Sequence, residues 1–239
     1  MSEVLEVDTP RGPARLHVDA ARGAERARLL MGHGAGGGVE APDLAVLAER
    51  LPATGVTVLR LEQPWRVAGR RVAGNPASLD EALRAVLATL WMQPGGTSSP
   101  LVLGGRSAGA RSACRVAATV DADGPAGVVV LAFPLHPPGR PERSRAGELL
   151  AVGAGTPLVV VQGERDSFGG PAEIEGVLAS RDPVTDFGEV VGIPLADHSF
   201  AVPRRAGAAA GTSTEQALDQ VAAAVGRAVD RIAGERGTE

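Results

Sequence analysis

Residues 101–111, LVLGGRSAGAR, place a serine between an apolar run and a helix-forming run. The run 101–104 is typical of a buried strand, and residues 110–120 favour a helix. Between them, Gly105-Arg106-Ser107-Ala108-Gly109 fits G-x-S-x-G, the pattern of a tight strand-to-helix turn that presents its serine. Side chains at the two glycines would collide inside that turn, and the helix N-terminus would stabilise negative charge beside the serine. The stretch predicts a strand–turn–helix unit with a reactive Ser107, the alternative being a tight turn with an idle serine.

Short apolar runs alternate with helical patterns over the rest of the chain. Residues 128–131 and 158–161 are continuously apolar, as in parallel strands that are covered on both faces. The first two expected strands resemble an antiparallel hairpin that leads into the sheet. The alternation predicts an α/β fold with a mostly parallel central sheet and helices on both faces. The expected strands are residues 4–7, 15–18, 27–32, 56–61, 101–104, 128–132, 158–162 and 189–193.

Helices are expected from apolar periodicity at residues 43–51 and 79–91, besides the one that follows Ser107. The second of these is preceded by Ser78 and contains Glu81, an S-x-x-E capping box. A last helix is expected to open at Thr212 with Glu215 three residues on, after a small-residue loop at 205–211. Its long amphipathic stripe should cover one face of the sheet. The stripe consists of Leu218, Val221, Val225, Val229 and Ile232.

The length and composition favour one soluble domain, residues 1–239, without an insertion long enough for a cap domain. No apolar run approaches the roughly 18–20 residues that a membrane helix needs, and the N-terminus has no export signal. The net charge of −4 gives no reason to bind nucleic acid or an anionic membrane. The single cysteine, Cys114, excludes an internal disulfide, suits a reducing compartment and is expected in the core. We therefore expect a cytoplasmic protein whose partner is a small acyl substrate, not nucleic acid or membrane.

Several kinds of chemistry are excluded by residue types that are missing. All 24 basic residues are arginine, which excludes a P-loop lysine and every Schiff-base mechanism. Tyrosine is absent as well, so no phenolic acid is available. No histidine pair has metal-ligand spacing, and we expect neither a metal nor another cofactor.

A reactive serine needs a base, and the base needs a group that orients it. In open α/β sheets such groups gather beyond the carboxyl ends of the strands. Asp166 follows the strand expected at 158–162, and His198 follows the one expected at 189–193. The chain order serine, acid, histidine also agrees with a G-x-S-x-G turn. Ser107, Asp166 and His198 are therefore predicted to form a catalytic triad.

Other residues compete for these roles. Glu164 is the main rival for the acid, while Asp197 is adjacent to His198 and therefore poorly placed to hydrogen-bond with it. His136 lies in a proline-rich loop, where a structural or pocket role is favoured over that of the base. His33 is expected to brace the glycine loop that contains it.

That glycine loop, residues 31–38 or MGHGAGGG, follows an expected strand. It fits both the G-x-G-x-x-G of a dinucleotide-binding loop and the loop that donates a backbone N–H to an oxyanion. Glu62, after the next strand, would suit a nucleotide ribose, but this hypothesis leaves the aligned serine, acid and histidine unexplained. We expect an oxyanion hole formed by the N–H groups of Ala108 and of the loop, with Ala35 the first choice and Gly34 the second.

Beyond these single motifs, the chain resembles the α/β-hydrolase fold family and, more narrowly, a group of small lidless proteins related to dienelactone hydrolases. The resemblance is carried by GHGAGGG, EQPWRVAGRR, GGRSAGAR, FPLHPPGRPE, GERDSFG and ADHSF, in that order over residues 31–200. It implies the α/β-hydrolase fold and the same three triad residues. Ala108 stands where a larger apolar residue is common, and Ser167 stands where proline is.

Together these patterns favour a serine hydrolase that cleaves a small ester, thioester or lactone through an acyl-enzyme on Ser107. The alternative is a binding or scaffold protein that keeps the turn as architecture, with Ser107 too far from His198 for a hydrogen bond. A dinucleotide-binding protein is the weakest of the three hypotheses. The residues expected to line a substrate pocket are Trp65, Arg66, Phe133, His136 and Phe168.

Overall fold

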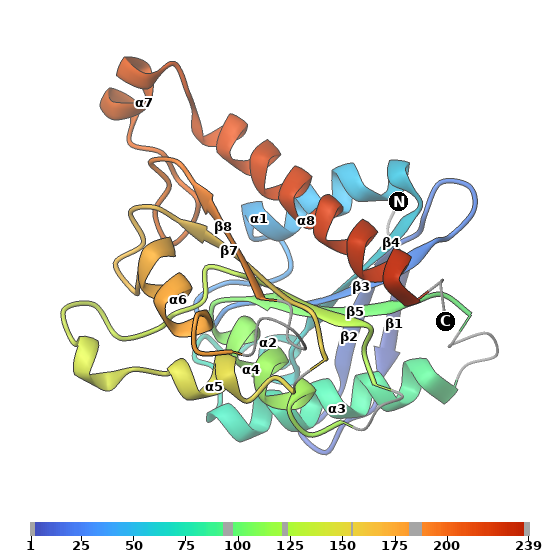
Figure 1. The fold of residues 1–239 in the computed structure, drawn as a ribbon. Coiled ribbons are helices and arrows are strands. Elements are labelled where there is room, and N and C mark those ends of the chain that lie inside the picture. The colour runs from blue at the N-terminus through green and yellow to red at the C-terminus, as the bar shows by residue number, and fades with distance from the viewer. Residues whose placement is uncertain (1–2, 93–97, 121–123, 154, 182–187, 237–239) are drawn as a thin grey trace.

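The computed structural model describes residues 3–92, 98–120, 124–153, 155–181 and 188–236. Within these residues the chain forms an eight-stranded sheet in the order β1-β2-β4-β3-β5-β6-β7-β8, with helices on both faces (Figure 1). The pairs β1–β2 and β2–β4 are antiparallel, and the remaining pairs are parallel. The predicted α/β fold with a mostly parallel sheet is confirmed. The strands are β1 (Glu3–Val7), β2 (Ala14–Asp19), β3 (Ala27–Gly32), β4 (Val56–Glu62), β5 (Leu101–Arg106), β6 (Gly127–Leu131), β7 (Leu158–Gly163) and β8 (Gly188–Ile193).

The helices form a layer on each side of this sheet (Figure 1). Helices α1 and α8 pack in the core cluster on one face, and α3 and α4 pack in the cluster on the other. The helices are α1 (Pro42–Arg50), α2 (Pro64–Val67), α3 (Pro76–Met92), α4 (Ala108–Ala117), α5 (Ala146–Leu150), α6 (Pro171–Leu178), α7 (Arg204–Ala210) and α8 (Thr214–Arg236), with short 3₁₀ turns η1 (Leu51–Thr54) and η2 (Pro141–Arg143).

The continuously apolar strands are explained by burial on both faces. Along β6, Val128 and Val130 belong to the cluster that includes α3 and α4, whereas Val129 and Leu131 belong to the cluster that includes α1 and α8. All four side chains are fully buried. Because successive side chains of a strand point to opposite faces, a central strand between two helical layers needs apolar residues at every position.

Helix α8 carries the predicted amphipathic stripe, but it begins slightly later than expected. Its first turn is capped by Ser213, whose Oγ accepts from the backbone N–H of Gln216 at 3.2 Å. Thr212 therefore lies before the cap. The stripe residues Val221, Val225, Val229 and Ile232 are at most 1% exposed, and Leu218 packs against the same cluster.

The capping box predicted at Ser78 and Glu81 is wrong. Helix α3 starts at Pro76, and Asn75 caps it by accepting from the backbone N–H of Ser78 at 2.9 Å. The Glu81 carboxylate instead pairs with Arg11 across the surface. Asparagine followed by proline at the first helical position is itself a strong start signal, and it outweighs the later serine.

Residues 205–211, expected as a loop, mostly form helix α7, which ends at Gly211 in the left-handed conformation with φ 66°. Alanine-rich sequence favours helix, and a glycine after it is a common stop. Helices α2, α5 and α6 were not predicted either, because short segments hold too few apolar residues to show a period.

The described part of the chain contains no helix that is both long and apolar enough to cross a membrane. Nor does it contain a group of three or more metal-ligating side chains placed to hold an ion.

Candidate active site

Ser107 lies in the turn between β5 and α4 and has a positive φ of 52° with ψ −113°, a combination that residues other than glycine rarely adopt. The close packing of this turn explains its glycines. A Cβ atom at Gly105 would lie 2.5 Å from the carbonyl carbon of Gly109, and one at Gly109 would overlap the carbonyl oxygen of Gly32. A strained serine held by such packing is typical of a functional position.

Ser107, His198 and Asp166 meet at the carboxyl ends of their strands. His198 Nε2 lies 2.9 Å from Ser107 Oγ, and His198 Nδ1 lies 2.8 Å from Asp166 Oδ2. The histidine comes from the loop after β8, and the acid comes from the loop after β7. A hydroxyl, an imidazole and a carboxylate in this sequence of hydrogen bonds can transfer a proton from the hydroxyl to the imidazole.

The acid is the buried member of the group. The Asp166 side chain has no exposed surface, while that of His198 is one-fifth exposed. Asp166 Oδ1 accepts from the backbone N–H of Phe168 at 2.8 Å, and Oδ2 also accepts from the side-chain amide of Gln162 at 2.9 Å. The carboxylate is therefore fully hydrogen-bonded, as a buried charge must be.

The rival acids make other contacts. Glu164 accepts from the backbone N–H of Leu195 at 3.1 Å and so links the loops after β7 and β8. Asp197 accepts from the backbone N–H groups of Ser199 and Ala201 and braces its own turn. Neither carboxylate contacts His198 among the described residues.

The remaining histidines of the sequence are engaged elsewhere. His136 lies against the carbonyl of Pro137 and the carboxylate of Glu173, and these contacts raise its pKa. His17 lies 3.2 Å from a carboxylate oxygen of Glu62. The acidic residue that would have suited a ribose is thus in contact with His17, which weakens the support for a dinucleotide site.

The glycine loop runs alongside Ser107. A Cβ atom at Gly34 would lie 3.3 Å from the Cβ atom of Ser107, so this backbone passes directly beside the serine. His33 braces the loop as expected, because its Nδ1 contacts the Gly34 carbonyl at 2.9 Å and its Nε2 accepts from the N–H of Gln63 at 3.2 Å. Burial lowers the pKa of His33 and so favours the neutral ring that these two contacts require. Ala35 is at the exposed tip of the loop.

The five expected pocket residues differ in their surroundings. The Phe168 ring lies 4.3 Å, centroid to centroid, from the ring of His198. Trp65 is buried against the edge of His33, and Arg66 is half-buried beside it in the sequence. Phe133 has no exposed surface and packs in the core, so it does not line an open pocket. His136 is connected to the site through its backbone N–H, which donates to the carbonyl of Phe168 at 3.0 Å.

Two contacts near the serine were not anticipated from the sequence. Arg106 pairs with the buried Asp43 at 2.8 Å and donates through Nη2 to the carbonyl of His198 at 2.8 Å. Gln162 donates to Asp166, as described above. Arg106 directly precedes Ser107 and Gln162 lies four residues before Asp166, yet no local pattern distinguishes a polar residue that points into the site from one that points to solvent.

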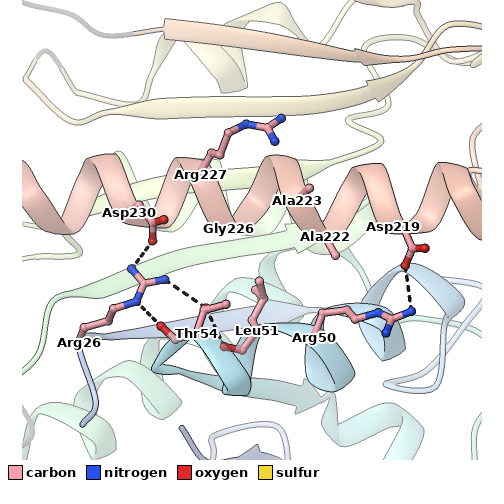
Figure 2. A pocket seen from close by; sticks show the side chains of 10 residues that line it. All are labelled: Arg26, Arg50, Leu51, Thr54, Asp219, Ala222, Ala223, Gly226, Arg227 and Asp230. Carbon is pink, nitrogen blue, oxygen red and sulfur yellow. Dashed lines mark hydrogen bonds and ion pairs between the residues drawn. The ribbon is translucent and has the colours of Figure 1, made fainter. Parts of the chain in front are cut away.

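A separate hollow of about 420 Å³ lies between α8 and the η1 turn (Figure 2). Figure 2 shows two of its arginines turned toward aspartates of α8, with Arg26 paired to Asp230 and Arg50 to Asp219. Arg26 directly precedes β3, whereas the glycine loop follows the other end of that strand. The hollow is therefore not part of the site around Ser107.

A family model described as an alpha/beta hydrolase domain matches residues 25–229. A search of curated protein sequences found no match.

Solved structures of similar fold include a lidless α/β serine hydrolase from Xanthomonas campestris, with a TM-score of 0.71 and 21% identity over 96% of this chain and 94% of that one. An α/β serine hydrolase homologue from Coxiella burnetii has a TM-score of 0.70 and 18% identity over 92% of this chain and 95% of that one. Dienelactone hydrolase from Anabaena variabilis has a TM-score of 0.67 and 21% identity over 95% of both chains. At these identities the likeness shows a shared fold.

Proposed function

The chain belongs to the alpha/beta hydrolase domain family, and we propose that it is a serine hydrolase cleaving a small ester, thioester or lactone. The observation that carries the proposal is the hydrogen-bonded series from Ser107 Oγ through the His198 ring to Asp166 Oδ2. Family membership alone would not support an activity, because one fold can serve many functions.

In the proposed reaction, Ser107 Oγ attacks the carbonyl carbon of the substrate while His198 Nε2 takes the hydroxyl proton. Asp166 holds the imidazole in the tautomer with its proton on Nδ1. The tetrahedral intermediate collapses when His198 returns the proton to the leaving oxygen or sulfur, which leaves an acyl-enzyme on Ser107. Water, deprotonated by the same histidine, then hydrolyses the acyl-enzyme and restores the serine.

The negative charge of the tetrahedral intermediate needs fixed N–H donors. The N–H of Ala108 is one candidate, because it belongs to the first residue of α4 and has no acceptor within the helix. The second donor would come from the glycine loop. The close approach of Gly34 to Ser107 makes Gly34 at least as good a candidate as Ala35. Removal of one such donor typically lowers kcat by about 10²–10³-fold.

The non-catalytic alternative is less well supported. A scaffold that kept the turn only as architecture would not need the base within hydrogen-bond distance of the serine, and the separation here is 2.9 Å. It would also not need a buried carboxylate behind the histidine, which costs free energy unless it is fully paired.

Labelling with a fluorophosphonate probe, followed by assays on p-nitrophenyl esters of increasing acyl length, tests the proposal. Wild type should be labelled and turn over short esters, whereas Ser107→Ala should do neither. Ser180→Ala is the matched control, because Ser180 is an exposed serine just after α6 whose hydroxyl donates to the carbonyl of Val177. A folded wild type that is neither labelled nor active on any ester would refute the proposal.

A further inference from the structure

Gln162 is the penultimate residue of β7, and its side chain is fully buried. The side-chain oxygen accepts from the backbone N–H of Phe133, just beyond β6, at 2.8 Å. The side-chain nitrogen donates to Asp166 Oδ2 at 2.9 Å and to the carbonyl of Gly169 at 2.7 Å. A longer contact of 3.3 Å joins the same nitrogen to the Phe133 carbonyl. One buried amide therefore links the end of β6 to two residues of the loop that carries the acid, Asp166 and Gly169.

These contacts restrict the orientation of the Asp166 carboxylate. Oδ2 accepts from both Gln162 and His198, and Oδ1 accepts from the backbone N–H of Phe168. Rotation of the carboxylate away from His198 would also break its bond to Gln162. The bonds from Gln162 and Phe168 thus favour the carboxylate orientation that reaches His198, independently of the bond to His198 itself.

We infer that Gln162 is a positioning residue for the proposed reaction: it holds Asp166 where that carboxylate can orient His198, an inference that rests on the proposed function. Residues that orient metal ligands through hydrogen bonds commonly matter nearly as much as the ligands, and we expect the same of a residue that orients a catalytic acid. Gln162 touches neither the serine nor the histidine and acts only through the acid.

The position requires an amide of this length. Glutamate would keep an acceptor for Phe133 but would face the Asp166 carboxylate and the Gly169 carbonyl with oxygen atoms. Methionine would fill the space without any hydrogen bond, leaving the N–H of Phe133 and the carbonyl of Gly169 unpaired and removing one donor from Asp166. Gln162→Met is therefore the informative substitution.

The test is a double-mutant cycle of Gln162→Met with Asp166→Asn, assayed on a short p-nitrophenyl ester. In the wild-type background Gln162→Met should lower kcat about tenfold to a hundredfold, with KM changed by less than about threefold. In the Asp166→Asn background it should have no further effect on kcat, because both residues act through one interaction. Val160→Ala, in the same strand and fully buried without side-chain hydrogen bonds, controls for general loosening of β7 and should keep kcat.

Equal losses of kcat in both backgrounds, or a loss no larger than that of Val160→Ala, would overturn the inference. If Gln162→Met does not fold, Gln162→Glu, which has the same shape, is judged by the same criteria.

If wild type has no activity, the proposed function fails, and the inference is then tested by proton NMR. The His198 Nδ1 proton should give a downfield signal in wild type and Val160→Ala that is lost in the Gln162 variant. An unchanged signal in that variant would overturn the inference.

Discussion

Arg106, the residue before Ser107, forms an ion pair with Asp43, with 2.8 Å between Nε and Oδ2 and only 13% and 2% of their side chains exposed. The same guanidinium donates through Nη2 to the carbonyl of His198. Since Arg106 ends β5 and Asp43 lies in the first turn of α1, the pair joins the nucleophile turn, the helix after the glycine loop and the histidine loop.

Asp43→Ala should lower the free energy of unfolding by about 3–5 kcal/mol, because it leaves the Arg106 charge buried and unpaired. Urea unfolding measures the effect. Asp219→Ala is the matched control, since it removes an ion pair with Arg50 whose side chains are about half exposed, and such pairs contribute only about 0–1 kcal/mol. Similar losses in both variants would show that the Arg106 pair is not desolvated.

Asp166→Asn should lower kcat by about 10⁴-fold on any ester that wild type cleaves, because the amide no longer holds the catalytic tautomer of His198. Glu164→Gln, which alters the rival carboxylate, should change kcat little. Steady-state kinetics of the two variants compares them directly. A large loss in Glu164→Gln together with a small one in Asp166→Asn would reverse the assignment of the acid.

Gly109→Ala should destabilise the protein by about 1–3 kcal/mol or more, because the new methyl group would overlap the carbonyl oxygen of Gly32, which is backbone and has little room to move. Gly234→Ala should do the opposite. Its Cβ atom would meet nothing within 4 Å on α8, and alanine in a helix is about 0.5–1 kcal/mol more favourable than glycine. Thermal unfolding should show a lower Tm for Gly109→Ala and a higher Tm for Gly234→Ala than for wild type. An unchanged Tm in Gly109→Ala would mean that the turn is less tightly packed than the structure indicates.

Cys114 should not react with Ellman's reagent at pH 8 in the native protein. Burial in α4 raises the pKa of its thiol to about 12, so almost no thiolate is present and the reagent has no access to it. The same cysteine should react fully in urea. Rapid reaction under native conditions would indicate that α4 opens readily.

His33 should make the protein less stable at mildly acidic pH. Burial lowers the pKa of its ring, whereas an exposed histidine of the unfolded chain has a pKa of about 6.5. The unfolded chain therefore binds the proton more readily, and the contribution of His33 to stability, complete above about pH 6.5, is lost as the pH falls through the folded value. Urea unfolding between pH 8 and pH 5 measures this effect. The free energy of unfolding should fall less with pH in His33→Gln than in wild type, and identical falls in the two proteins would contradict this account.

Much of the sheet was predictable from local sequence. Its buried strands are the apolar runs of the chain, because a strand such as β6 must supply apolar side chains to two helical layers. The short helices were missed, and the cap of α3 was misplaced, because their local sequence carries a weaker signal. Segments of four to eight residues show no clear period, and the S-x-x-E pattern at Ser78 competes with the earlier start signal of Asn75 and Pro76.

By itself, the sequence determined the strands and the longer helices in their chain order, the turn that bears Ser107 and the edge of the sheet where acid and histidine belong. Those features follow from short-range periodicity and from the rule that parallel strands bring their carboxyl ends together. Only the tertiary structure decided that Asp166, rather than Glu164 or Asp197, meets His198. It alone revealed that Gln162 donates to this acid, because that contact depends on how two strands and a loop pack together, which the neighbours of a residue in the chain do not specify.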